Sequence, residues 1–91
     1  MSLLRGHVAP AGTTPGAKLT LDAAVRQARV RVVSMSGGPR LLQRLAALGI
    51  VPGAVLVVLK PHGPTIVGLG GARIAIGRSA AAAVDVEVLS K

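Results

Sequence analysis

The chain has 91 residues, 51% of them apolar, and a formal net charge of +8, yet it contains no cysteine and no aromatic residue. Because a chain this short buries only about 60% of its unfolded surface, it can form one small domain with an aliphatic core, and the lack of cysteine excludes disulfide frameworks and thiolate metal sites. The positive charge favours acidic partners, phosphates or anionic lipid without choosing among them.

The N-terminal segment, residues 1–17, contains glycine, proline and threonine without any apolar period, and it predicts a flexible tail ahead of a domain over residues 18–91. No apolar run resembles a secretion signal. The longest such run, residues 45–59, is shorter than the roughly 20 residues that a spanning helix needs, and Pro52 interrupts it. We therefore expect a cytoplasmic protein with no direct membrane insertion.

The domain begins with a lead-in followed by a strand. Leu19, Leu21 and Val25 predict a short helical turn that covers one end of the core. Residues 28–35 then alternate valine with arginine, including Arg29 and Arg31, which is the period-two pattern of a half-buried strand. The outer face of this strand is therefore expected to be basic.

A short amphipathic helix is predicted after that first strand. Pro39 suits a first helical position, and Gly49 suits a left-handed residue just past the end of a helix. Between them, apolar residues recur at helical spacing: Leu41, Leu42, Leu45 and Leu48. Arg40, Gln43 and Arg44 are left on the opposite, solvent-facing side.

The remaining predicted strands are residues 55–59, 65–67, 72–76 and 84–88. The first of these is an unbroken Val/Leu run, which predicts a strand buried on both faces. Gly70 and Gly71 predict a hairpin between the next two strands. Ser79, ahead of a run of alanines, predicts a capped single helical turn before the last strand.

Five short strands with one helical excursion after the first predict a mainly β fold, a small SH3-like antiparallel five-stranded barrel. A sheet without aromatic bulk can hide its apolar face by curling round itself, and closure would also remove its exposed edges. A five-stranded oligonucleotide-binding barrel is the competing topology. The short strands favour the SH3-like form.

Several stretches carry a family resemblance. Residues 44–55 combine a helix end, Leu-Gly-Ile, with a Pro-Gly turn and an aliphatic strand, and residues 74–78 read Ile-Ala-Ile-Gly-Arg before an alanine-rich turn. Together with residues 33–38 and 61–64, and in this order, they resemble the FeoA family of ferrous iron transport accessory proteins. The resemblance covers roughly residues 19–89.

The resemblance implies a small SH3-like domain that acts with the membrane GTPase-permease FeoB in bacterial ferrous iron uptake. We therefore expect no enzyme but a cytosolic protein-interaction module, whose partner is a FeoB-type ferrous iron permease contacted through its cytosolic part. The same domain occurs at the C-terminus of iron-dependent repressors. A length of 91 residues leaves no room for a helix-turn-helix domain as well, so a stand-alone accessory protein is expected.

The sequence predicts no catalytic residue, no metal site and no cofactor. The glycines around Gly70 precede a strand, whereas a phosphate loop needs a helix there. His7 and His62 are the only imidazoles, and three carboxylates and no cysteine are too few to complete a coordination sphere around them. Asp85 and Glu87 share one solvent face of a strand and are expected to pair with exposed arginines.

Basic residues are the remaining candidates for a site. Arg40, Gln43 and Arg44 share a helix face, and Arg73 and Arg78 flank the predicted hairpin and alanine-rich turn. We expect these side chains to form a docking rim for the transporter. The alternative function is a small basic barrel that binds nucleic acid, which the charge supports. Since single-strand binders stack bases on aromatic side chains, and this chain has none, no specific nucleic acid is expected.

Overall fold

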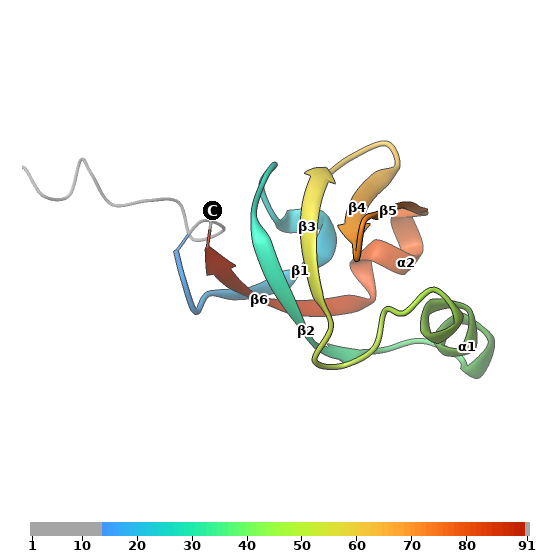
Figure 1. The fold of residues 1–91 in the computed structure, drawn as a ribbon. Coiled ribbons are helices and arrows are strands. Elements are labelled where there is room, and N and C mark those ends of the chain that lie inside the picture. The colour runs from blue at the N-terminus through green and yellow to red at the C-terminus, as the bar shows by residue number, and fades with distance from the viewer. Residues whose placement is uncertain (1–13, 91) are drawn as a thin grey trace, which may run out of the picture.

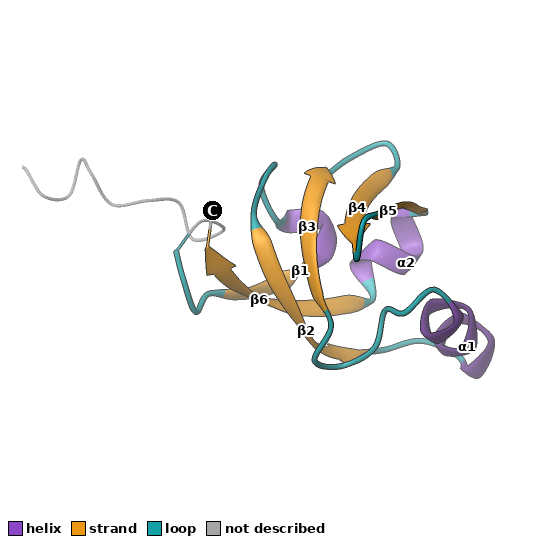
Figure 2. Cartoon of the chain, in the orientation of Figure 1, coloured by secondary structure: helices purple, strands orange, loops and turns teal. Residues whose placement is uncertain are grey.

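The computed structural model describes residues 14–90, which form one antiparallel sheet with three short helical elements (Figures 1 and 2). In chain order the elements are β1 Lys18–Thr20, the 3-10 turn η3 Leu21–Ala23, β2 Arg29–Met35, α1 Pro39–Ala47, β3 Val55–Lys60, β4 Thr65–Leu69, β5 Ala72–Ile76, α2 Arg78–Ala82 and β6 Val84–Ser90. The prediction of a mainly β, antiparallel fold is confirmed. The part of the predicted tail at residues 1–13 lies outside the described residues, as does His7.

The sheet has six strands, in the order β1-β6-β2-β3-β4-β5, so the predicted count of five was wrong. The additional strand is β1, in which Leu19 pairs with Val86 of β6. Three residues are too few to show an alternating pattern, and the pairing that defines β1 comes from the far end of the chain. As a result α1 follows the second strand and not the first, and the predicted helical turn is confined to η3.

The sheet is open, so the prediction of a closed barrel was also wrong. Within residues 14–90, β1 and β5 are the two edge strands, and they do not pair with each other. Two helical elements cover the core between these edges: Leu21 of η3 and Ala81 of α2 are fully buried, and η3 and α2 are in contact. Side chains of the helical elements therefore cover the core at the place where a closed barrel would have two paired strands.

Strand β3 is buried on one face only, contrary to the prediction. Leu56 and Val58 are fully buried, whereas Val55 is 42% exposed. The register explains the difference, because Val55 pairs with Arg31 of β2 and therefore shares the outer face with a charged side chain. Although every residue in the run is Val or Leu, its side chains alternate between the core and the solvent-facing side of the sheet.

The core is aliphatic, as predicted, and lies on the inner face of the sheet. Its largest fully buried side chains are Leu21, Val30, Val32, Ile50, Leu56, Val58, Val67, Val84, Val86 and Val88. Full burial of one such side chain contributes about 1.5–3 kcal/mol, so many small residues replace the aromatic bulk of other domains. The inner face is thus the stabilising one, which leaves the outer face of the sheet and the exposed sides of the helices available for other contacts.

The predicted helix and hairpin are confirmed, and the predicted cap of α2 is not. Gly49 ends α1 with a φ of +90°, and Gly70 and Gly71 join β4 to β5 with φ of +57° and +87°, as a tight hairpin of this type requires. The residue that caps α2 is Gly77, while Ser79 lies inside the helix. In Figure 1, α1 stands beyond the end of β2, at the margin of the domain.

Candidate functional site

The predicted docking residues are all exposed, but the structure distributes them over different surfaces. Arg40, Gln43 and Arg44 lie on α1. Arg73 lies on β5 and Arg78 begins α2. Of these five residues, only Arg44 lines a groove beside α1, whereas Arg78 lines one other hollow and Arg73 lines two more.

An apolar groove of about 50 Å³ runs between α1 and the segment that joins β5 to α2. Its lining is apolar except for one guanidinium, and consists of Leu41, Arg44, Leu45, Leu48, Ala75, Ile76, Gly77 and Ala80. Leu45 is buried at its base, while Leu48 is 46% exposed at its mouth. Because a large leucine side chain left this open gains stability when it is covered, the groove can accept an aliphatic side chain of a partner.

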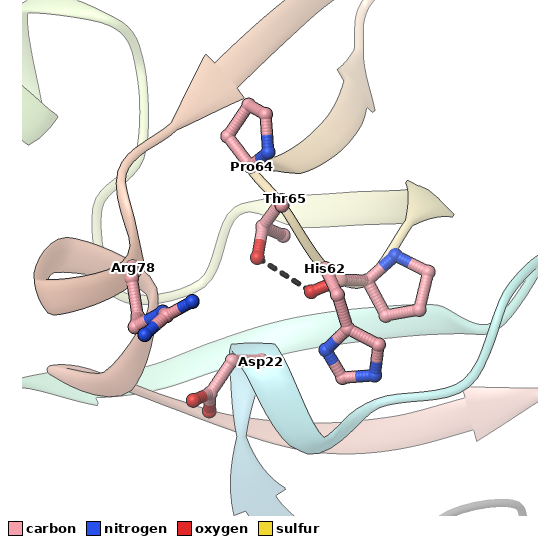
Figure 3. A pocket seen from close by; sticks show the side chains of 7 residues that line it. Asp22, His62, Pro64, Thr65 and Arg78 are labelled. Atoms are coloured by element: carbon pink, nitrogen blue, oxygen red, sulfur yellow. Dashed lines mark hydrogen bonds between the residues drawn. The ribbon is translucent and has the colours of Figure 1, made fainter.

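A second hollow, of about 310 Å³, lies between η3, the loop before β4, and the start of α2 (Figure 3). The side chains of Asp22, His62 and Arg78 line it from η3, the loop before β4, and α2. Asp22 accepts a hydrogen bond from Thr20 Oγ1 at 2.6 Å, and Thr65 Oγ1 donates to the carbonyl of Pro61 at 2.7 Å. The carboxylate of Asp22 and the guanidinium of Arg78, which carry opposite charges, both line this hollow.

His62, the one histidine in the described part of the chain, has only Asp22 as an acidic companion in that hollow. Among residues 14–90 there is no group of three or more His, Cys, Asp or Glu side chains that could hold a metal ion. The residues of the hollow therefore do not supply the ligand set of a metal centre.

The two acidic residues of β6 were expected to pair with exposed arginines, and only one of them does. Glu87 lies 3.7 Å from the guanidinium of Arg31, as an ion pair across neighbouring strands. Asp85 instead accepts a hydrogen bond from Ser34 Oγ at 3.0 Å. An exposed ion pair of this kind contributes at most about 1 kcal/mol.

The outer face of the sheet brings together residues whose placement could not be predicted from the sequence. Arg29 of β2 and Arg73 of β5 both line a hollow of about 430 Å³ on that face. The alternating pattern placed Arg29 on an outer face, but its proximity to Arg73 depends on the order of the strands. No local sequence signal contains that order.

The model of the FeoA domain family matches residues 19–88 of this chain. Among solved structures, the chain is 36% identical to a crystallised iron uptake regulatory protein (FeoA), with a TM-score of 0.74 and coverage of 79% of this chain and 97% of that one. It is 29% identical to a FeoA protein from Chlorobium tepidum, with a TM-score of 0.72 and coverage of 79% of this chain and 71% of that one.

The same fold is similar to part of a larger protein. The chain is 26% identical to a manganese-dependent transcriptional repressor, with a TM-score of 0.74, over 84% of this chain and 44% of the repressor. A comparison with curated proteins finds no match. Within residues 14–90, none of the helices has the length and apolar character needed to cross a membrane.

Proposed function

The chain belongs to the FeoA domain family, and we propose that it is a non-enzymatic accessory protein of ferrous iron uptake that acts by contact with the cytosolic part of a FeoB-type permease. The family match over residues 19–88 and the 36% identity to an iron uptake regulatory protein support the association with iron transport. The proposed location is the cytoplasm, on the side where such a permease would present its soluble part.

The groove beside α1 is the observation on which the contact rests. Its lining combines an exposed aliphatic residue, Leu48, with the guanidinium group of Arg44, and the exposed Arg40 lies about one helical turn before Arg44. Protein interfaces commonly place a buried apolar anchor inside a charged margin. A permease segment with an aliphatic side chain and nearby carboxylates would match both parts of this surface.

Arg73 and Arg78 line hollows other than the α1 groove, and we propose that they lie outside the direct transporter contact. Arg78 nevertheless begins the helix that supplies Ala80 to the groove wall. The proposed docking surface is therefore the α1 groove, defined by Leu41, Arg44, Leu45, Leu48 and Ala80 with Arg40 at its margin.

The test combines complementation of iron uptake, in a strain lacking this gene, with recovery of the permease on the immobilised chain in the presence of chelator. Leu48→Asp should abolish both, because it places a charge at the mouth of the apolar groove. Val33→Asp is the matched control, since Val33 is 43% exposed on β2, outside the groove lining, and receives the same change. Val33→Asp should retain both activities.

Two results would contradict the proposal. If the wild-type chain neither restores uptake nor recovers the permease, the assignment to iron transport fails. If Leu48→Asp and Val33→Asp behave alike while both remain folded, the α1 groove is not the docking surface.

A further inference from the structure

The outer face of the sheet brings together basic residues that are distant in sequence. In the strand registers Arg29 pairs with Val57, Val57 with Gly68, and Gly68 with Arg73. Since paired residues of neighbouring strands point to the same face, these positions form one row across β2, β3, β4 and β5. Gly68 has no side chain, so no side chain rises from the sheet at this position between the two arginines that end the row.

Two open hollows extend this row along the face, of about 430 and 360 Å³, and both include Leu59 and Arg73. Arg29 lines the larger one, and Arg26 and Lys60 line the smaller one. All these basic residues are exposed, and none of the described residues that line either hollow is Asp or Glu. We call Arg26, Arg29, Lys60 and Arg73, with the aliphatic residues Val55, Val57 and Leu59 between them, the basic sheet face.

The three acidic residues of the chain lie outside these hollows, and Asp22, on η3, lines the hollow of Arg78 instead. Asp85 and Glu87 are on β6, on the far side of β2 from the hollows. Glu87 is already paired with Arg31, and Asp85 accepts a hydrogen bond from Ser34. The basic sheet face therefore keeps an uncompensated positive charge and complements an anionic surface.

The shape and composition of the face select among anionic partners. A stretch of single-stranded nucleic acid would need aromatic side chains for stacking, and the chain has none. A protein segment would need an apolar pocket as its anchor, and the lining of the α1 groove is closer to this than the larger, more open hollows of the sheet, which carry several basic side chains. Guanidinium groups bind phosphate through paired hydrogen bonds. The exposed Val55 and the half-buried Val57 and Leu59 among them suit the boundary between headgroups and acyl chains.

We propose that the basic sheet face binds peripherally to the surface of an anionic phospholipid bilayer, without insertion of a helix. This goes beyond the transporter contact and uses a surface different from the α1 groove. Binding to the leaflet would confine the chain to the layer in which a membrane partner presents its cytosolic part, and such confinement raises the effective concentration of the two proteins. The Val55 side chain, 42% exposed, lies where it would meet the headgroup region.

The experiment measures co-sedimentation of the full chain with vesicles of phosphatidylcholine, with and without phosphatidylglycerol, at low and at physiological salt. The chain should bind the phosphatidylglycerol vesicles, with weaker binding as salt rises, and should leave the pure phosphatidylcholine vesicles unbound. The assay contains no permease, so its outcome is independent of the proposed transporter contact.

Paired substitutions locate the binding face. Arg29→Gln with Arg73→Gln should lower the partition coefficient about 25-fold, because each basic side chain near an anionic leaflet contributes about 1 kcal/mol, or roughly fivefold. Arg40→Gln with Arg44→Gln removes the same charge from α1 and should lower it less than about fivefold. Arg29→Lys with Arg73→Lys should keep most of the binding, which separates loss of charge from loss of structure.

The proposal is overturned if the chain does not co-sediment with the phosphatidylglycerol vesicles, or if it binds both vesicle types equally. Equal losses in the two glutamine pairs would also overturn it, since they would show dependence on net charge and not on this face. Tighter binding to an oligonucleotide than to the anionic vesicles at the same salt would assign the face to nucleic acid instead.

Discussion

The backbone amide of Ile50 donates a hydrogen bond of 2.9 Å to the carbonyl of Leu45, and the side chains of both residues are buried. The amide of Gly49, whose φ is +90°, donates to the carbonyl of Ala46 at 2.9 Å. This pair of bonds is a Schellman motif, in which an apolar contact accompanies the reversal of the chain. It anchors the end of α1 to the core and so fixes one wall of the groove.

Leu45 is the main anchor of α1, because it is the one buried residue of that helix and is only 2% exposed. Leu45→Ala should lower the free energy of unfolding by about 2–5 kcal/mol, as expected when a buried leucine is truncated. Gln43→Ala, at an exposed position of the same helix, should change it by less than about 0.5 kcal/mol. Urea denaturation of both variants makes the comparison, and equal losses would mean that the faces of α1 are wrongly assigned.

Gly49 should tolerate no side chain. A Cβ there would lie 3.0 Å from Leu69 Cδ2, on a backbone with positive φ, so Gly49→Ala should cost more than about 1 kcal/mol. Gly68→Ala is the control, because its Cβ would make ordinary contacts of 3.6 Å or longer and its φ is not positive. That variant should keep or raise the thermal midpoint, since alanine is favoured over glycine within a strand. A smaller loss at Gly49 than at Gly68 would contradict this account.

Local signals in the sequence were sufficient to predict features that depend on residues close together in the chain. Gly49 marked the end of α1, and the valine alternation marked the inner face of β2 and β6. The open sheet was not predictable in this way, because the burial of Leu21 and Ala81 between the edges depends on contacts between distant segments. For the same reason the sequence placed Arg29 on the outer face of its strand, but it could not place Arg29 in one row with Arg73, three strands along the sheet.

The boundary of the N-terminal tail can be tested by truncation. Gly16 donates its amide to the carbonyl of Val88 at 2.7 Å, and Val88 donates to the carbonyl of Ala17 at 2.9 Å. Removal of residues 1–13 should leave stability unchanged, while removal of residues 1–17 should keep the fold but cost about 1–3 kcal/mol for two lost bonds. Proton–nitrogen spectra and denaturant melts of both forms decide it. Widespread loss of resonances after the shorter truncation would show that the tail is structural.

Any affinity for RNA or DNA should be electrostatic alone. We expect dissociation constants of about 1 µM or weaker at physiological salt, a steep fall in affinity as salt rises, and no preference among sequences. Fluorescence anisotropy with two oligonucleotides at two salt concentrations measures this. Tight binding that survives high salt and distinguishes the oligonucleotides would favour the nucleic-acid function over the transport one.

We expect Arg40 and Arg44 to control the rate at which the chain associates with the permease proposed as its partner. Both are exposed on α1, where Arg44 lines the groove and Arg40 lies about one turn before it. Charges at the rim of an interface affect the association rate more than the dissociation rate. Reversal of both to Glu should slow association with the cytosolic region of the permease about tenfold at low salt, with the difference shrinking as salt screens it. The free energy of unfolding should change by less than about 0.5 kcal/mol. Surface plasmon resonance at two salt concentrations separates the rates; an unchanged association rate, together with full rescue of iron uptake by the reversed variant, would exclude these arginines from the contact.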